Sequence, residues 1–168
     1  MPTVTYQVGA GADDWELYGT WSNNTSIFVG NFFGTARFGF RVTGVDIPAG
    51  STFNSAKITI RSPGAQSGDS NDPCNATISA NLSDNPSAPA NQTVDDGLTL
   101  TSHTVAWNSI EHFASEADHD SPDITAIIQE LFDAGYLTGG KAAIILVRDN
   151  ASDGTSRRTG FGYDSVPS

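Results

Sequence analysis

The chain has 168 residues, a length that suits one domain, and we treat residues 1–168 as a single unit. Eight Lys and Arg residues against 19 Asp and Glu residues give a formal net charge of −11. This net negative charge repels a phosphate backbone, so the composition disfavours nucleic acid as a partner. Apolar residues make up only 38%, and Gly, Ser, Thr, Asn and Asp fill the difference, as in proteins built from short strands and many turns.

The sequence gives no sign of a membrane span or of an oxidising compartment. No apolar run approaches the roughly 20 residues that a membrane helix needs. Cys74 is the single cysteine, so no internal disulfide forms. The first residues, MPTVTYQVGAGADD, lack a charged segment followed by an apolar one, which predicts no export signal and synthesis in a cytoplasm.

Most of the chain alternates in the manner of short strands separated by Gly, Pro, Asn and Asp. The expected strands occupy residues 3–8, 26–33, 36–42, 55–62, 74–83, 98–107, 140–147 and 159–165, with a turn near Gly19 between the first two. Residues 26–33 and 36–42 are separated by a Gly-Thr pair and are predicted to form a hairpin. Residues 47–53, IPAGSTF, predict a turn in which Gly50 takes a positive φ.

Two strands carry a clear burial signal. In ARFGFRV (36–42) every second residue is large and apolar, which predicts one buried face and one solvated face. The run GKAAIILV (140–147) is the most apolar of the chain and predicts a central strand buried on both faces. The segments 63–73 and 84–97 are polar and rich in Pro and Asn, and we expect both to be surface loops.

A single helix interrupts the strand pattern at about residues 122–134. Ser121 is the expected N-cap and Pro122 the first helical residue. Apolar residues at 124, 127, 128 and 131 form one stripe, and Gly135 suits the position after the helix. The count of strands with one short helix predicts an all-β fold, a two-sheet antiparallel β-sandwich or jelly roll.

Three stretches resemble sites without matching them. GYLTGGKA (135–142) is close to the phosphate-binding P-loop motif, but it has Ala142 where the motif has Ser or Thr. It also follows a helix and precedes a strand, whereas a P-loop follows a strand and precedes a helix. The residues Glu111, His112, Glu116, Asp118, His119 and Asp120 follow no metal-ligand spacing, so a hydrated acidic loop is the favoured interpretation. DNASDG (149–154) lacks the later ligands of a calcium loop and is interpreted as a hairpin turn. We therefore expect no cofactor and no metal among the assigned site residues.

Two other groups of residues stay open. Asp13, Asp14 and Glu16 would meet Asp164 if the terminal strands pair, and such carboxylates would suit calcium. Trp15, Tyr18 and Trp21 are aromatic rings of the kind on which sugars stack, although packing in a core accounts for such rings more often. No nucleophile motif is present and no pair of carboxylates stands out, so we expect a protein that is not an enzyme.

The order of four segments resembles a family of β-sandwich (jelly-roll) proteins. These segments are FRVTGVDIPAGSTFNSAKITI, HTVAWNS, SPDITAIIQELFDAGYLTGGKAAIILV and GYDS, and the resemblance covers roughly residues 38–165. Members of this family occur as bacteriophage virion and decoration proteins and as modules of bacterial surface and carbohydrate-active proteins. The resembling residues are architectural, so the likeness speaks for the fold more than for function.

A stand-alone acidic sandwich without an export signal is, within that family, similar to a phage capsid decoration (cement) protein. This resemblance implies a homotrimer that is assembled in the host cytoplasm, resides in the virion and binds the major capsid protein or other virion proteins. It implies no nucleic-acid and no membrane partner. The alternative is a carbohydrate-binding or host-attachment module of a tail, fibre or surface protein, with Trp15, Tyr18 and Trp21 as the sugar-binding residues and calcium as an optional ligand.

Overall fold

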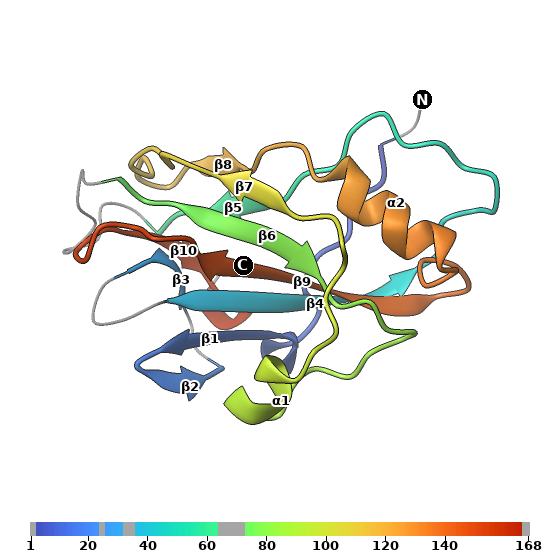
Figure 1. Cartoon of the computed structure of the whole chain (residues 1–168), viewed down its shortest axis with the longest axis horizontal. Coiled ribbons are helices and arrows are strands. Elements are labelled where there is room, and N and C mark those ends of the chain that lie inside the picture. The colour runs from blue at the N-terminus through green and yellow to red at the C-terminus, as the bar shows by residue number, and fades with distance from the viewer. Residues whose placement is uncertain (1–2, 24–25, 32–35, 64–72, 166–168) are drawn as a thin grey trace.

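The computed structural model describes residues 3–23, 26–31, 36–63 and 73–165. It confirms the predicted all-β fold, in which antiparallel strands dominate and helices are few and short (Figure 1). The strands are β1 Asp14–Tyr18, β2 Thr20–Ser22, β3 Ser26–Gly30, β4 Arg37–Val45, β5 Thr59–Arg61, β6 Ala76–Ala80, β7 Val105–Trp107, β8 Asp118–Asp120, β9 Lys141–Asp149 and β10 Arg157–Phe161. The helices are α1 Gln92–Asp96 and α2 Thr125–Asp133, with 3₁₀ turns η1 Gly11–Asp13 and η2 Tyr163–Ser165.

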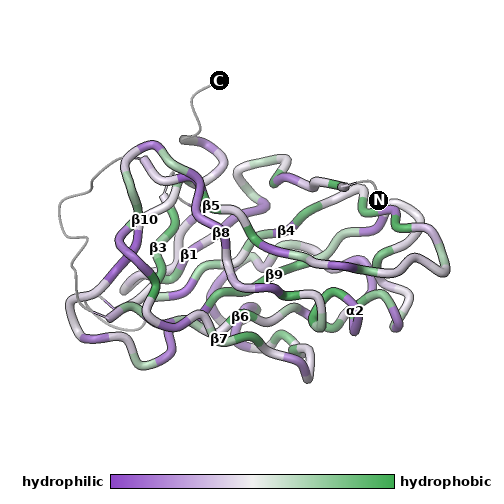
Figure 2. Tube along the Cα trace, turned by 90° about the horizontal axis from the view of Figure 1, so that it is seen from above, coloured by the Kyte–Doolittle hydropathy of each residue, from purple (hydrophilic) through white to green (hydrophobic). Residues whose placement is uncertain are grey.

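One layer is a six-stranded antiparallel sheet in the order β2-β1-β4-β9-β6-β7. The other layer contains two strand pairs, β10-β3 and β5-β8. Side chains of β3 and β5, such as Val29 and Ile60, share one core cluster with Phe38 of β4 and Val147 of β9. Figure 2 shows β5 and β8 set apart from β6 and β7, as expected for two layers around a common core.

The β4–β9 pair is the centre of the six-stranded sheet. Its register places Phe38 opposite Val147 and Phe40 opposite Ile145. The predicted burial of β9 on both faces is confirmed: Ala143, Ile145 and Val147 lie in the core between the layers, whereas Ile144 and Leu146 belong to a second cluster on the outer face.

The predicted solvated face of residues 36–42 is wrong, because this outer face is covered. Gly39 lies opposite Trp15 of β1, and a Cβ at position 39 would collide with the Trp15 ring. The covering segment is 84–97. Most of its residues are exposed, as expected for a surface segment, but it contains the unpredicted helix α1 and the fully buried Asp95. A helix of five residues is too short to produce an apolar period in the sequence, so α1 was not predicted.

The predicted hairpin between residues 26–33 and 36–42 is also wrong. β3 pairs with β10 in the second layer, and β4 pairs with β1 and β9 in the first. The alternation of apolar and polar residues predicts a strand but not the strand with which it pairs. Ile27 and Val29 would be buried in the core from a position in either layer. Gly30 has φ +112, and a Cβ there would collide with the backbone carbonyl oxygen of Ser156, so this close approach requires glycine.

Several boundaries differ from the sequence-based expectation. Residues 3–8 contribute only an isolated bridge between Val8 and Val42, and residues 98–107 form a bridge at Leu100 before β7. The turns at Gly19 and Gly50 have the expected positive φ. Most of the expected loop 63–73 lies outside the described residues.

The predicted helix corresponds to α2, which begins at Thr125 and not at Pro122. Ser121 does not cap it, because its hydroxyl accepts the N–H of Ile58. Asp123 instead accepts the N–H of Thr125 at 2.9 Å. The C-terminal prediction is confirmed: Gly135 has φ +77, and the N–H of Tyr136 bonds to the Leu131 carbonyl, a Schellman ending. Among the described helices, none has the length and apolar character to span a bilayer.

Glu130 links α2 to the segment that precedes β7. Its carboxylate accepts the backbone N–H groups of Ser102 at 2.8 Å and His103 at 2.9 Å, and it also contacts the His103 ring. These two backbone donors, followed by the side chains of the same residues, lower the pKa of Glu130 to about 2.

We predict that Glu130→Gln lowers stability at neutral pH and has little effect in strong acid. Because the folded pKa lies below the ordinary value of 4.5, the carboxylate stabilises the fold above about pH 5. That contribution is lost as the pH falls toward 2. Urea unfolding of both proteins at several pH values measures it, with Asp133→Asn on the same helix as the control. A difference between Glu130→Gln and wild type that stays constant from pH 7 to pH 2 would contradict this linkage.

Candidate functional site

Trp15, the first of the three candidate sugar-binding aromatics, is part of the core. Its side chain is 1% exposed, and its indole N–H donates to Asp95 Oδ1 at 3.1 Å. The ring stacks against Trp21 with a centroid separation of 6.0 Å. Trp15 thus offers no exposed ring face, whereas Trp21, on β2, is half-buried.

Tyr18 lies on the opposite face of β1. Its ring packs 4.8 Å from that of Phe28, and its hydroxyl accepts a hydrogen bond from Arg157. Side chains three residues apart on a strand point to opposite faces, so Trp15 and Tyr18 are on different sides of the sheet. The structure brings Trp15 and Trp21 together and leaves Tyr18 apart. Sugar binding by these residues stays a prediction. Only Trp21 and Tyr18 could contact a sugar, because the Trp15 ring is buried.

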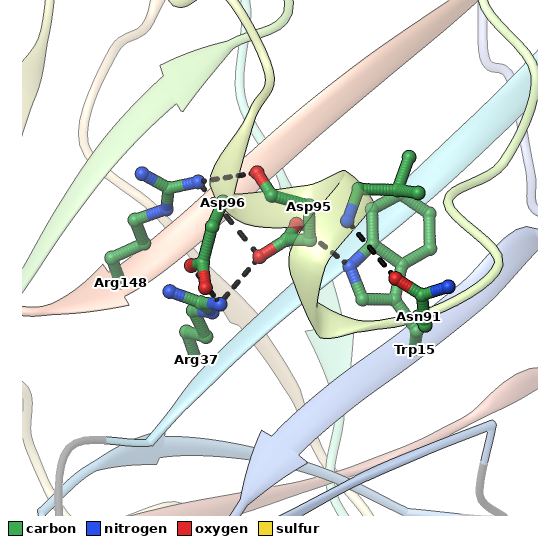
Figure 3. Close-up of polar contacts among 7 residues, drawn as sticks. Trp15, Arg37, Asn91, Asp95, Asp96 and Arg148 are labelled. Carbon is green, nitrogen blue, oxygen red and sulfur yellow. Dashed lines mark hydrogen bonds and ion pairs between the residues drawn. The ribbon is translucent and has the colours of Figure 1, made fainter.

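A buried charged network lies on the outer face of the six-stranded sheet (Figure 3). Asp95 of α1 is fully buried, and its Oδ2 lies 2.9 Å from Arg37 Nε and 3.9 Å from Arg148 Nη2. Arg37 and Arg148 are direct neighbours across β4 and β9. Asp96 adds an exposed ion pair to Arg37. The two guanidinium groups thus share one enclosed carboxylate.

This network attaches segment 84–97 to the sheet. Asn91 caps α1 by accepting the N–H of Val94, and α1 then presents Asp95 to Trp15 and the two arginines (Figure 3). The Arg148 pKa is lowered by burial first, and the Asp95 charge opposes this. All partners of Asp95 are protein groups in fixed positions, so the arrangement is suited to holding the fold together.

The candidate metal stretch at residues 111–120 is divided between a loop and β8. Asp118 pairs with Arg61 at 3.2 Å, and Asp120 pairs with Lys57. Glu111, His112 and Glu116 are exposed on the preceding loop. Within the described residues, no group of three or more His, Cys, Asp or Glu side chains is arranged to hold a metal ion.

The other two loop candidates have structural roles in the described chain. Residues 135–142 connect α2 to β9, as expected, and Lys141 is fixed by Asp84 at 2.8 Å and by the Gly135 carbonyl. Residues 149–154 form a turn in which Asp149 accepts the N–H of Ser152. The prediction of a hairpin here is wrong, because β9 and β10 belong to different layers.

A cleft of about 320 Å³ opens between β7, β8 and the loop that joins them. Trp107, Phe113 and His119 line it, and the rings of Phe113 and His119 stack with their centroids 4.1 Å apart. The acidic residues at the cleft are Glu111, Asp118 and Asp120. Since Asp118 and Asp120 have basic partners, Glu111 is the carboxylate that is available to a ligand here.

The terminal acidic residues meet, although not by strand pairing. The backbone N–H of Tyr163 in η2 donates to Asp14 Oδ2 at 2.8 Å, which brings Asp164 next to the start of β1. Asp13 is occupied by Arg41 at 2.8 Å. Glu16 is buried at 2% exposure and accepts a hydrogen bond from Ser22. Of the four predicted residues, the structure brings Asp14 and Asp164 together.

Comparisons with known proteins do not assign this chain to a family. No family model matches the chain, and no curated protein matches it at a significant level.

Sequence reasoning missed Asp95 and the two arginines that enclose it. Asp95 occurs in QTVDDG, a polar run that looks like a solvated turn. Its burial depends on contacts with residues more than 50 positions away, for which the local sequence holds no signal.

We predict that Asp95→Ala lowers the free energy of unfolding by about 3–5 kcal/mol, because it leaves two adjacent guanidinium groups and the Trp15 N–H without their shared acceptor. The matched control is Asp96→Ala in the next residue, whose carboxylate is 49% exposed and whose loss should cost less than about 1 kcal/mol. Chemical denaturation followed by tryptophan fluorescence measures both. Equal losses for the two variants would contradict the role assigned to Asp95.

Proposed function

We propose that this chain is a non-enzymatic bacteriophage structural protein, a capsid decoration protein that binds the outside of the head and stabilises it. The observation that carries the proposal is the distribution of charge. Every Lys and Arg side chain of the protein already has a partner within the chain, and most of the described carboxylates that have no basic partner are exposed.

The ion pairs account for six of the eight basic residues. The pairs join Arg37 to Asp95 and Asp96, Arg41 to Asp13, Lys57 to Asp120, Arg61 to Asp118, Lys141 to Asp84 and Arg148 to Asp95. Arg157 lies over the Phe28 ring and donates to Tyr18, and Arg158 donates to the carbonyls of Ile110 and Glu111. An anionic partner would therefore find no basic side chain that lacks a partner, whereas a basic protein surface would be attracted.

A small acidic β-sandwich is suited to binding a phage capsid in many copies. Each copy would contact a basic patch on the major capsid protein, or on another virion protein, through exposed carboxylates that keep no internal partner. A stable interface buries at least about 1,000 Å², and a trimer would reach this area by engaging several subunits at once. The function is binding without turnover, and the sandwich supplies a rigid support for it.

The test is co-sedimentation of the purified protein with empty head shells of the phage that encodes it. We expect saturable binding at about 0.1 M salt that is lost near 1 M, because the screening length falls from about 10 Å to about 3 Å. Light scattering of the free protein measures whether it is a trimer before it binds. Absence of shell binding at low salt, or binding that is insensitive to salt, would contradict the proposal.

The second candidate is a carbohydrate-binding or host-attachment module, and the cleft between β7 and β8 favours it. The His119 ring, which is stacked on the buried Phe113, lies beside the exposed Glu111 carboxylate, a hydrogen-bond acceptor for a sugar hydroxyl.

We predict that, if this candidate is right, Glu111→Gln weakens binding on a glycan array by at least about tenfold, the effect of losing one charge-assisted hydrogen bond. Glu116→Gln is the matched control, since Glu116 is exposed on the same loop and does not line the cleft. Trp15→Ala is unsuitable as a probe because it removes a buried ring of the core. No glycan binding by wild type would eliminate this candidate and leave the decoration protein.

A further inference from the structure

A buried carboxylate at the start of β1 has one oxygen that the protein does not satisfy. The Asp14 residue is 4% exposed. Its Oδ2 accepts the Tyr163 N–H, but its Oδ1 is enclosed and has no hydrogen-bond partner among the residues that the structure describes. A buried charge without a partner is strongly unfavourable, so this oxygen requires a proton or a cation.

A second carboxylate lies in the same corner of the molecule. Asp14 bonds to Tyr163, and the next residue, Asp164, carries its carboxylate over Gly11 at the beginning of η1. A Cβ at Gly11 would collide with both Asp164 oxygens, so the glycine leaves the space that this carboxylate occupies. Asp164 is exposed, which leaves the pair open to solvent on one side.

The negative charge of this corner has no basic partner. Burial raises the pKa of Asp14, the backbone N–H groups of Tyr163 and of Asp14 itself lower it, and the negative charges of Asp164 and Asp13 raise it. Arg41 is engaged by Asp13 and by the Pro86 carbonyl. No ion pair found in the described part of the chain involves Asp14 or Asp164. Two carboxylates from opposite ends of the sequence thus approach each other without a basic residue between them.

We propose that Asp14 and Asp164 bind a calcium ion that ties the end of the chain, at η2, to the start of β1. Calcium takes six to eight oxygen ligands, and carboxylates, carbonyls and water all serve. Two protein carboxylates are therefore enough when the solvent-facing side of the ion keeps its waters. The arrangement needs no third acidic side chain.

The burial of Asp14 Oδ1 selects calcium over magnesium. Direct contact with an enclosed oxygen requires the ion to lose part of its hydration shell. Magnesium dehydrates reluctantly and demands near-ideal octahedral geometry, whereas calcium accepts irregular coordination. This inference is independent of the proposed function, since it concerns a different part of the molecule from the cleft and does not require a virion partner.

The experiment measures the thermal unfolding and calcium-binding isotherms of the purified protein in EDTA, in millimolar CaCl₂ and in millimolar MgCl₂. We expect calcium to raise the Tm of wild type and magnesium to do so much less. Asp14→Asn should abolish the calcium response and should be at least as stable as wild type in EDTA. The amide removes the repulsion, and its oxygen still accepts the Tyr163 N–H.

Asp164→Asn should weaken calcium binding by at least about tenfold, since affinity follows the charge of the ligands. The matched control is Asp133→Asn, which removes an exposed carboxylate of α2 and should leave the calcium response intact. A wild-type protein that does not respond to calcium would overturn the proposal. So would an equal calcium response in the Asp14→Asn and Asp133→Asn proteins, which would indicate diffuse binding to an acidic surface.

Discussion

The structure depends on the pairing of β4 with β9, because β9 carries apolar side chains on both faces and both faces must be covered. The second layer covers the inner face, where Phe38 and Val147 lie in the main core. The outer face carries Ile144 and Leu146, and among the described strands no second sheet lies over it. The segment with α1 and the ring of Trp15 take that place (Figure 3).

Covering the outer face encloses two neighbouring positive charges, and the Asp95 carboxylate neutralises them. Arg37 and Arg148 project from adjacent positions of β4 and β9, and two like charges side by side on a sheet repel each other. The carboxylate that neutralises them is delivered by the same segment that covers Leu146 and its neighbours. Apolar burial and charge compensation are therefore coupled here, and α1 fits only when both are satisfied (Figure 3).

The parts of the fold that the sequence predicts well are those that neighbouring residues determine. The apolar run of β9, the stripe and Gly135 ending of α2, and the turn at Gly50 are all of this kind. The partner of β3 and the burial of Asp95 depend on residues far away in the chain, so alternation and composition could not reveal them. The candidate site shows the same division. The sequence marks Asp14 and Asp164 as acidic, but their approach arises from the Tyr163 contact and not from the strand pairing that was expected.

Asp95 and Asp14 are both buried carboxylates, but they differ in what surrounds them, and that difference separates a structural role from a binding role. Asp95 has two arginines and an indole N–H around it, so its charge is compensated by groups that folding places there. Asp14 has backbone N–H donors, from Tyr163 and from its own residue, and a neighbouring carboxylate. With every basic side chain engaged elsewhere, folding supplies no cation to this corner. A charge that the chain buries but does not neutralise is left for a ligand, and the exposed side at Asp164 gives that ligand a way in.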